Sequence, residues 1–377
     1  LVSVVNEYDM QYCFEGKRLE KGNENAWNKI VDKTIPLEEV IKKSRELGKD
    51  VINTYLENYS KLKDLSDENV AELFLKLFKL GVMLCSYGYI GPIVDLPKAY
   101  LSEKLGEILD KRNARGEIIF LSESSMEKYS DIAKKELMQT IIDDGDLNSW
   151  LSKWFWINFG NFGPGFNIEK LNEEYGEFIE DKEKAKKELE RIVNDRESLK
   201  ERQEKRFDEL GLSDEEKYFF YQAQKITFLK AFRLDLLFCI WGFFDKIFDI
   251  YSEKLGLDKD VFRFLVKEDV AEVITGKKIV DGKEILKRKD NSVWITKPEG
   301  TKILVGEDAD KYVKENIEFE EVEEIEDTDE IRGNIAFPGK VSGMVKIIRN
   351  IKDMENVEEG NILVAIQTAP EFLPAMK

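Results

Sequence analysis

The first residues of the chain alternate between apolar and polar types. The apolar positions of this run are β-branched or aromatic and stand two or four residues apart: Val2, Val4, Tyr8, Tyr12 and Phe14. Alternation with these residue types is typical of half-buried strands. The pattern predicts a short hairpin or two strands within residues 1–18.

The spacing becomes helical further along the chain. Apolar residues recur at helical spacing from Ile41 to Leu56 and again from Val70 to Gly81. This period places them on one face of an α-helix, and Ser66 before the second run is a typical N-cap. We predict two amphipathic helices, the second ended by the glycine-rich residues 87–92, and a further helix from Leu96 to Leu109.

Charged residues dominate the segment from Asp181 to Leu210. Its thin apolar stripe predicts a long exposed helix, whose charged face is either a solvated surface or a docking surface. Ser213 and Glu216 then have the spacing of a capping box. They open a helix that is expected to run toward Leu255 and to stop at Gly256.

Strand-like sequence returns near the C-terminus. Two short runs, Ser292 to Thr296 and Thr301 to Val305, flank a turn sequence and predict a hairpin. Residues 318–330 contain nine acidic residues among thirteen, which is typical of a linker. The expected organisation is a mainly helical domain at 1–316 with small β elements near 1–18 and 290–306, an acidic linker at 317–331, and an incomplete β-rich domain at 332–377.

The formal net charge of -18 narrows the possible partners. A negative field repels nucleic-acid backbones and anionic membrane surfaces. The longest apolar run, Leu236 to Phe244, has nine residues, whereas a membrane span needs about 20. We therefore expect neither nucleic acid nor a membrane as a partner, and any phosphate site must depend on local cations or backbone N–H groups.

Histidine is absent from the 377 residues. Imidazole bases, histidine metal ligands and a phosphohistidine are therefore excluded from this stretch of chain, and no metal site is expected in it. The three cysteines, Cys13, Cys85 and Cys239, stand far apart among apolar residues. We expect them to be buried free thiols in a reducing, cytoplasmic compartment.

Glycines and prolines stand at fixed spacings in the last 45 residues. Residues 333–345 have the form G-x-x-x-x-P-G-x-x-x-G-x-V, and residues 368–377 have the form T-x-P-E-x-x-P-x-M-K. This pattern resembles the opening of the phosphohistidine swivelling domain of phosphoenolpyruvate synthases and pyruvate phosphate dikinases. A small β-rich domain without this chemistry is the alternative interpretation. Gly343 is expected to permit a bulge or a close backbone approach.

The resemblance implies both a fold and a reaction. In that family a histidine shortly after the M-K sequence accepts a phosphoryl group and carries it to a second site. The resemblance therefore implies a phosphohistidine beyond Lys377, no catalytic residue or cofactor in this chain, and Mg with ATP or phosphoenolpyruvate in the complete system. The expected fold class is mainly α with small β elements, a helical domain followed by the start of a β/β/α swivelling domain. Since no glycine-rich phosphate loop is visible, nucleotide binding is expected in a separate chain or domain.

The segment from Phe159 to Phe166 resembles the family motif F-G-H-R-G-P-G-E. Asn161, Phe162 and Phe166 stand where His, Arg and Glu are usual. The resemblance places this loop near the site of a small-molecule phosphoryl acceptor. Its two substituted phenylalanines favour a more apolar acceptor than a small phosphorylated acid.

Five residues are expected to bind that acceptor: Asn161, Phe162, Phe166, Lys230 and Arg233. The two cations are three positions apart on a predicted helix and would offset phosphoryl charge. We expect the loop and this helix to line one cavity, with Asn161 within about 15 Å of Arg233, the span of one pocket. The alternatives are that the aromatic residues belong to the core and that Asp235 and Asp245 pair with the cations. For the whole protein, the choice is between a phosphotransferase and a non-catalytic helical regulatory or partner-binding protein.

Overall fold

The computed structural model describes residues 1–6, 9–157, 159–160, 163, 165–297, 299–318, 340–348 and 357–365. Contacts along the chain divide it into two units, Leu1–Val322 and Glu323–Lys377. Most of the predicted acidic linker, residues 319–331, lies outside the described residues.

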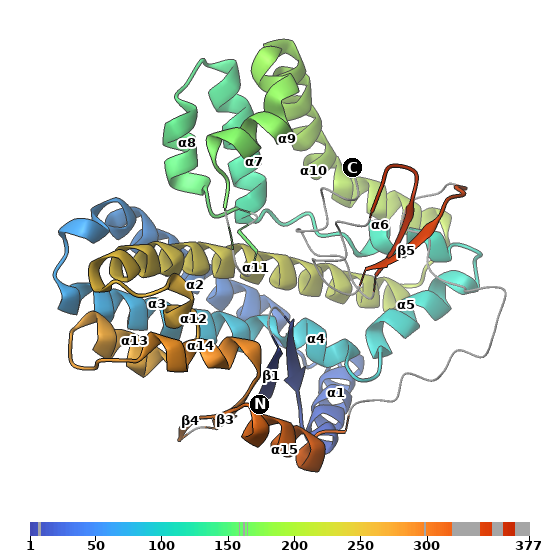
Figure 1. Ribbon diagram of the computed structural model, residues 1–377. Coiled ribbons are helices and arrows are strands. Elements are labelled where there is room, and N and C mark those ends of the chain that lie inside the picture. The colour runs from blue at the N-terminus through green and yellow to red at the C-terminus, as the bar shows by residue number, and fades with distance from the viewer. Residues whose placement is uncertain are drawn as a thin grey trace. The chain divides into compact units, whose positions relative to one another are not determined.

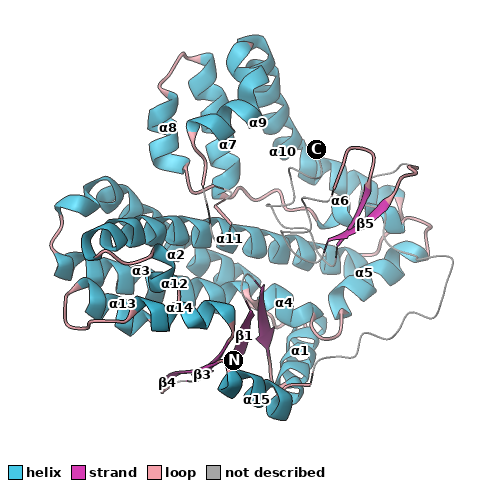
Figure 2. Ribbon diagram, in the orientation of Figure 1, coloured by secondary structure: helices cyan, strands magenta, loops and turns pink. Residues whose placement is uncertain are grey.

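The first unit is built mainly from α-helices (Figure 2). They are α1 (Gly16–Val31), α2 (Leu37–Asn58), α3 (Asp67–Gly88), α4 (Ile90–Asp95), α5 (Tyr100–Asp110), α6 (Ile118–Ser122), α7 (Tyr129–Ile142), α8 (Leu147–Trp154), α9 (Ile168–Glu180), α10 (Lys182–Glu209), α11 (Asp214–Leu255), α12 (Lys259–Arg263), α13 (Lys267–Ile274), α14 (Gly282–Asp290) and α15 (Glu307–Asn316). Two short 3-10 helices lie at Tyr59–Asp64 and Arg115–Glu117. The expected fold class, mainly α with small β elements, is confirmed.

The two predicted hairpins are confirmed, and they form one sheet. β1 (Val2–Asn6) and β2 (Asp9–Cys13) are antiparallel neighbours, as are β3 (Ser292–Lys297) and β4 (Gly300–Val305). The strand order is β2-β1-β3-β4, with β1 paired antiparallel to β3. A lone hairpin is only marginally stable in water, so pairing of the first and last strands of the unit gives both hairpins a stable partner.

Helix α11 is the centre of the unit (Figure 1). It starts at the predicted capping box, in which the Ser213 hydroxyl accepts from the Glu216 N–H and the Glu216 carboxylate accepts from the Ser213 N–H. It ends where Gly256 adopts a left-handed conformation with φ 65°. Helices α2, α3 and α7 pack against it, so α11 is buried over much of its circumference.

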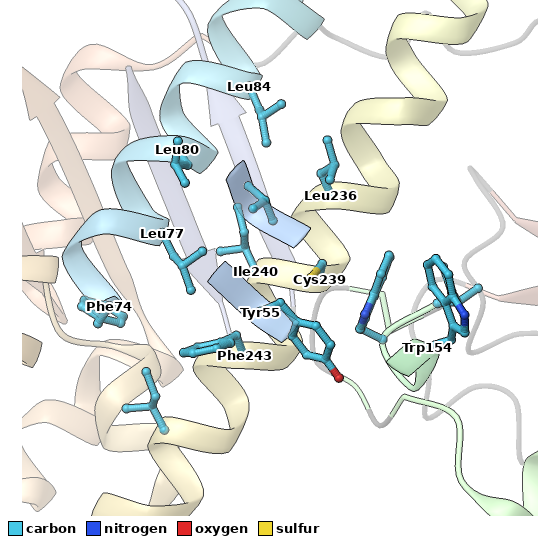
Figure 3. Packing of buried hydrophobic residues seen from close by; sticks show 14 of the residues in the cluster. Tyr55, Phe74, Leu77, Leu80, Leu84, Trp154, Leu236, Cys239, Ile240 and Phe243 are labelled. Carbon is cyan, nitrogen blue, oxygen red and sulfur yellow. The ribbon is translucent and has the colours of Figure 1, made fainter. Parts of the chain in front are cut away.

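The main hydrophobic core lies between α2, α3 and α11. Figure 3 shows Tyr55 from α2 and Leu77 from α3 directed toward Ile240 and Phe243 of α11. These four side chains are at most 2% exposed. A smaller core surrounds the N-terminal half of α11 and includes residues of α5 and α10 such as Leu109 and Phe207. The apolar faces predicted for α2 and α3 are therefore confirmed.

The charged helix α10 buries one narrow side. Its buried residues are Ala185, Leu199, Gln203 and Phe207, and the helix packs against α7 and α9. The exposed Arg191 bonds to the largely buried Glu188 at 2.8 Å and to the exposed Asp195 at 3.0 Å. Such contacts between neighbouring helical turns are the pairs expected of a solvated helix face.

The end of α3 differs from the prediction. Helix resumes at Ile90 after a single intervening residue, so residues 87–92 interrupt the helix at Tyr89 without ending the helical structure. The combined stretch Asp67–Asp95 is long and apolar enough, by length and composition, to cross a membrane, although the longest uninterrupted apolar run had predicted no such segment. A core helix meets the same criterion, and α3 packs against α2, α11 and α13.

The next helix also starts later than predicted. α5 begins at Tyr100, and Leu96 has extended dihedral angles of φ -130° and ψ 129°. Leu96 precedes Pro97, whose ring disfavours the helical conformation of the residue before it.

The cysteines are all free thiols. Cys239 is buried, whereas Cys13 and Cys85 are partly exposed. The prediction of buried free thiols is therefore confirmed for Cys239 alone.

In the second unit, the described residues form a pair of parallel strands, β5 (Val345–Ile348) and β6 (Ile362–Ala365). A side chain at Gly343 would place its Cβ 2.2 Å from the Gly360 carbonyl oxygen, so the predicted close backbone approach is confirmed. Gly360 has φ 87° and makes the turn into β6. The P-G sequence at 338–339 and residues 368–377 lie outside the described residues.

Candidate functional site

The aromatic loop before α9 is held by core packing. Phe166 is 7% exposed, with ring centroids 6.0 Å from Trp150 and 6.2 Å from Tyr175. Its N–H donates to the Phe155 carbonyl at 2.7 Å. Asn161 and Phe162, the other two predicted acceptor-binding residues of this loop, lie outside the described residues.

The loop also folds back on itself at Gly165. A Cβ at this position would lie 2.2 Å from the Phe155 carbonyl oxygen, so only glycine fits here. In the structure, the close neighbour is the backbone of the same loop.

The loop meets α11 at Gly242. A Cβ there would be 2.9 Å from the Phe155 ring and 3.2 Å from the Trp156 Cβ. Gly242 lies nine positions after Arg233, which at about 100° and 1.5 Å per residue places it on the opposite side of α11 and about 14 Å further along the axis. The described contacts therefore do not bring Phe166 and Arg233 together.

Lys230 and Arg233 do share a side of α11, as their spacing predicts. Lys230 is exposed, and it forms no ion pair with any residue that the structure describes. The neighbouring acids are engaged elsewhere. Asp245 bonds to Lys259 at 2.7 Å and to Arg263 at 2.8 Å.

Asp235 points to a different element as well. Its carboxylate accepts from the Ser130 N–H at 2.7 Å, at the start of α7. Burial raises the pKa of Asp235, and the hydrogen bond from Ser130 partly offsets this effect. The alternative in which Asp235 and Asp245 neutralise the two cations is not what the structure shows.

Arg233 lies buried against the junction of α3 and α4. It is 8% exposed, and its guanidinium carbon stands 4.6 Å from the centre of the Tyr89 ring. A Cβ at Gly88 would lie 2.5 Å from the Arg233 Cδ, so the missing side chain of Gly88 makes room for this arginine. The Nε and Nη1 atoms are buried and have no hydrogen-bond partner among the described residues.

One further group, the Cys85 thiol, lies within electrostatic reach of this arginine, and Tyr12 lies near Cys85 and Tyr89. Burial raises the pKa of the Cys85 thiol, and the Arg233 charge partly offsets that increase. Burial also raises the pKa of Tyr12 on β2, with smaller contributions from Tyr89 and Cys85. Strand β2, helix α3 and helix α11 therefore meet at one place. We call Gly88, Tyr89, Lys230 and Arg233 the Arg233 pocket.

Sequence reasoning missed the part of this pocket that comes from α3. It took Gly88 and Tyr89 only as a helix end. A glycine inside a helical pattern can mark a close packing contact, but in sequence it looks the same as a glycine that ends a helix.

Two surface cavities are lined by described residues that are not among the predicted site residues. One surface cavity of about 360 Å³ is lined by Val4, Asn6, Asn291, Asp310, Val313 and Lys314. Another of about 400 Å³ is lined by Asn58, Leu65, Asn69, Glu72, Leu73 and Lys76. Within the described ranges, no group of three or more His, Cys, Asp or Glu residues is placed to hold a metal ion.

Comparison with known proteins finds short similarities. The chain is 47% identical over 47 residues to a probable phosphoenolpyruvate synthase of Methanothermobacter thermautotrophicus, 45% identical over 64 residues to one of Archaeoglobus fulgidus, and 41% identical over 66 residues to the phosphoenolpyruvate synthase of Pyrococcus furiosus. These matches cover 12%, 17% and 17% of this chain and 7%, 8% and 8% of the relatives. No family model and no solved structure matches. The partial similarity supports a relation to phosphoenolpyruvate-utilising enzymes.

Proposed function

We propose that the chain is part of a phosphotransferase of the phosphoenolpyruvate synthase-like family. This phosphotransferase passes a phosphoryl group through a phosphohistidine to or from a small-molecule acceptor. The observation that carries the proposal is the 41–47% identity to phosphoenolpyruvate synthases over 47–66 residues. Because the chain contains no histidine, the carrier residue belongs to sequence beyond Lys377 or to another chain.

The second unit supports this assignment at the level of local structure. Glycines are retained at the spacing of the swivelling-domain opening, and Gly343 has a backbone neighbour that leaves no room for a side chain. In the proposal, this unit carries the phosphoryl group, and the helical unit holds the acceptor. Mg and ATP or phosphoenolpyruvate act at a site in a separate chain or domain, in the cytoplasm.

Labelling of a longer protein tests the proposal. A protein that extends past Lys377 through the family's histidine position is incubated with ATP labelled at both its β- and γ-phosphates or with labelled phosphoenolpyruvate. We expect an acid-labile, base-stable phosphoryl group, as a phosphohistidine gives, and its loss when that histidine is changed to alanine. The 377-residue chain serves as the control and should remain unlabelled. Absence of label in the longer protein, with an active relative labelled in parallel, would refute the proposal.

One observation favours a non-catalytic role for the helical unit. Phe166 stands where the resembling motif has glutamate, and its side chain is packed between Trp150 and Tyr175. At this position the loop serves core packing, as a regulatory or partner-binding protein with a retained scaffold would require. The residue at the family histidine position decides between the two functions, since a phosphoryl carrier needs an imidazole there.

A further inference from the structure

Arg233 differs from every other partly buried arginine that the structure describes. Arg112, Arg196, Arg206, Arg263 and Arg288 each donate to a carboxylate or a backbone carbonyl at 2.6–2.8 Å. Arg233 is more deeply buried than these, yet its Nε and Nη1 have no partner among the described residues. The third guanidinium nitrogen, Nη2, is not among the buried unpartnered atoms and has no hydrogen-bond partner among the described residues. Nη2 is therefore the nitrogen that is accessible from the surface.

A buried guanidinium without a partner is a strong sign of a missing anion. Transfer of a charged group out of water is costly unless it is paired. Most buried groups can reduce this cost by changing protonation state, but a guanidinium cannot deprotonate in proteins. An anion from outside the described chain would supply the negative charge and the hydrogen-bond acceptors that the neighbouring side chains do not provide.

The surroundings of Arg233 indicate where such an anion enters. The Tyr89 ring covers one face of the guanidinium and is itself 42% exposed. Only this ring therefore separates that face of the guanidinium from solvent. Lys230 stands one turn away on the same side of α11, and helix neighbours at this spacing have Cβ atoms about 5–6 Å apart. The rim of the pocket is therefore an exposed lysine beside an exposed aromatic ring.

The charge of the pocket indicates the kind of anion. Arg233 and Lys230 together carry two positive charges, and no carboxylate among the described residues pairs with either. A phosphate monoester carries a charge of about -1.5 to -2 at neutral pH and offers three acceptor oxygens. A carboxylate brings one negative charge and two oxygens.

We infer that Arg233, Lys230 and Tyr89 form a binding site for a dianionic phosphate group. The inference rests on the contacts of Arg233 and does not require phosphoryl transfer. Binding to the helical unit can therefore fail while the proposed function holds, and labelling of a longer protein can fail while binding holds.

Titration of the 377-residue chain with inorganic phosphate tests the site. The melting temperature is measured up to about 10 mM phosphate, at fixed ionic strength, because exposed charges are screened by salt. We expect saturable stabilisation, as for any ligand that binds only the folded state. The Arg233→Met variant should weaken binding by about tenfold or more, the factor contributed by a charge-assisted hydrogen bond.

A matched pair of lysine variants on α11 keeps the test independent of folding. Lys230→Met should weaken phosphate binding by about two- to fivefold, as expected for an exposed charge. Lys225→Met removes the same charge from the same helix, but Lys225 pairs with Glu38 at 2.8 Å, and phosphate binding should be unchanged. Acetate, a planar monoanion, should bind more weakly than phosphate.

Four outcomes overturn the inference. Three of them are absence of saturable phosphate stabilisation in the unmodified chain, equal phosphate affinity in Arg233→Met, and equal affinity for acetate and phosphate. Equal weakening by Lys225→Met and Lys230→Met also overturns it, because a general charge effect would then explain the binding.

Discussion

Arg112, which packs against α11, and Arg233, which belongs to α11, are in opposite situations. Arg112 lies near the start of the helix, where its nitrogens donate to the carbonyls of Ile108 and Leu210 at 2.7 and 2.8 Å and to the Glu216 carboxylate at 2.9 Å. We call these four residues the Arg112 cluster. Arg233, further along the same helix, is more buried and has no described hydrogen-bond partner.

This difference in hydrogen bonding distinguishes an arginine that stabilises the fold from an arginine that is available to bind a ligand. In the Arg112 cluster, the arginine pairs with a carboxylate and donates hydrogen bonds to backbone carbonyls, so the cluster contributes to the stability of the fold. In the Arg233 pocket, the buried guanidinium charge has no hydrogen-bond partner among the described residues, and this lowers the stability of the fold. Ligand-binding sites commonly lower the stability of the unliganded protein, because the group that pairs with the buried charge is supplied by the ligand.

The largest effect is expected from breaking the Arg112 cluster. Arg112→Met removes one donor from the Ile108 carbonyl, from the Leu210 carbonyl and from the Glu216 carboxylate, and should lower the free energy of unfolding by about 2–4 kcal/mol. Urea unfolding followed by circular dichroism measures this. Arg202→Met, at an arginine whose side chain is 49% exposed, is the control and should change little. If Arg112→Met is as stable as the control, the cluster is not structural.

The next effect concerns the room that Gly88 leaves for Arg233. Gly88→Ala places a Cβ 2.5 Å from the Arg233 Cδ, and overpacking of this kind should cost about 1–3 kcal/mol. The cost should largely disappear in the Gly88→Ala, Arg233→Ala double variant.

Gly176→Ala in α9 is the matched control for this prediction. Nothing lies within 4 Å of a Cβ at Gly176, so alanine should stabilise that helix by about 0.5–1 kcal/mol. A double-mutant cycle that gives no coupling between Gly88 and Arg233 would contradict the close packing of α3 on α11.

A smaller effect of opposite sign is expected at Arg233 itself. Replacement of an unpaired buried charge by an apolar side chain of similar length is neutral or stabilising, so Arg233→Met should raise the free energy of unfolding by about 0–2 kcal/mol in phosphate-free buffer. Arg112→Met in the same buffer moves stability in the opposite direction. A loss of more than about 1 kcal/mol for Arg233→Met would mean that a partner within the chain holds this arginine.

The smallest effect is a pH dependence in the Arg112 cluster. Burial works to raise the pKa of Glu216, but the hydrogen bonds from Ser213 and Arg112 outweigh it and lower the pKa overall. A carboxyl whose pKa is lowered by folding contributes stability above its unfolded pKa of about 4.3 and loses that contribution as the pH falls through the folded pKa. The stability difference between the unmodified chain and Arg112→Met should therefore narrow below about pH 4. Urea unfolding at pH 7 and pH 3.5 tests this, and a constant difference would contradict it.

Local rules were enough to predict the main elements of the fold. Ser213 and Glu216 predicted the start of α11, and Gly256 predicted its end, because capping bonds join residues at most five positions apart. The alternation at the N-terminus and around residues 292–305 predicted two hairpins for the same reason. The interruption at 87–92 was predicted incompletely, since a glycine that ends a helix and one that admits a neighbouring side chain look alike in sequence.

The candidate site could be predicted only in part. Lys230 and Arg233 were correctly placed on one side of a helix, because their spacing alone decides this. The proximity of Phe166 to that pair was inferred from resemblance and stays a prediction; the structure shows the Phe166 ring packed against Trp150 and Tyr175. The expectations for Asn161 and Phe162 stay predictions.

By itself, the sequence determined where helices and hairpins form, the negative charge of the chain, and the absence of histidine chemistry from these residues. Only the tertiary structure decided that the two hairpins make one sheet and that Arg233 is enclosed by Gly88 and Tyr89 without a partner. The physical reason is the sequence separation over which each kind of interaction acts. Backbone hydrogen bonds and caps act between near neighbours in sequence, whereas burial and charge pairing depend on which distant segments pack together.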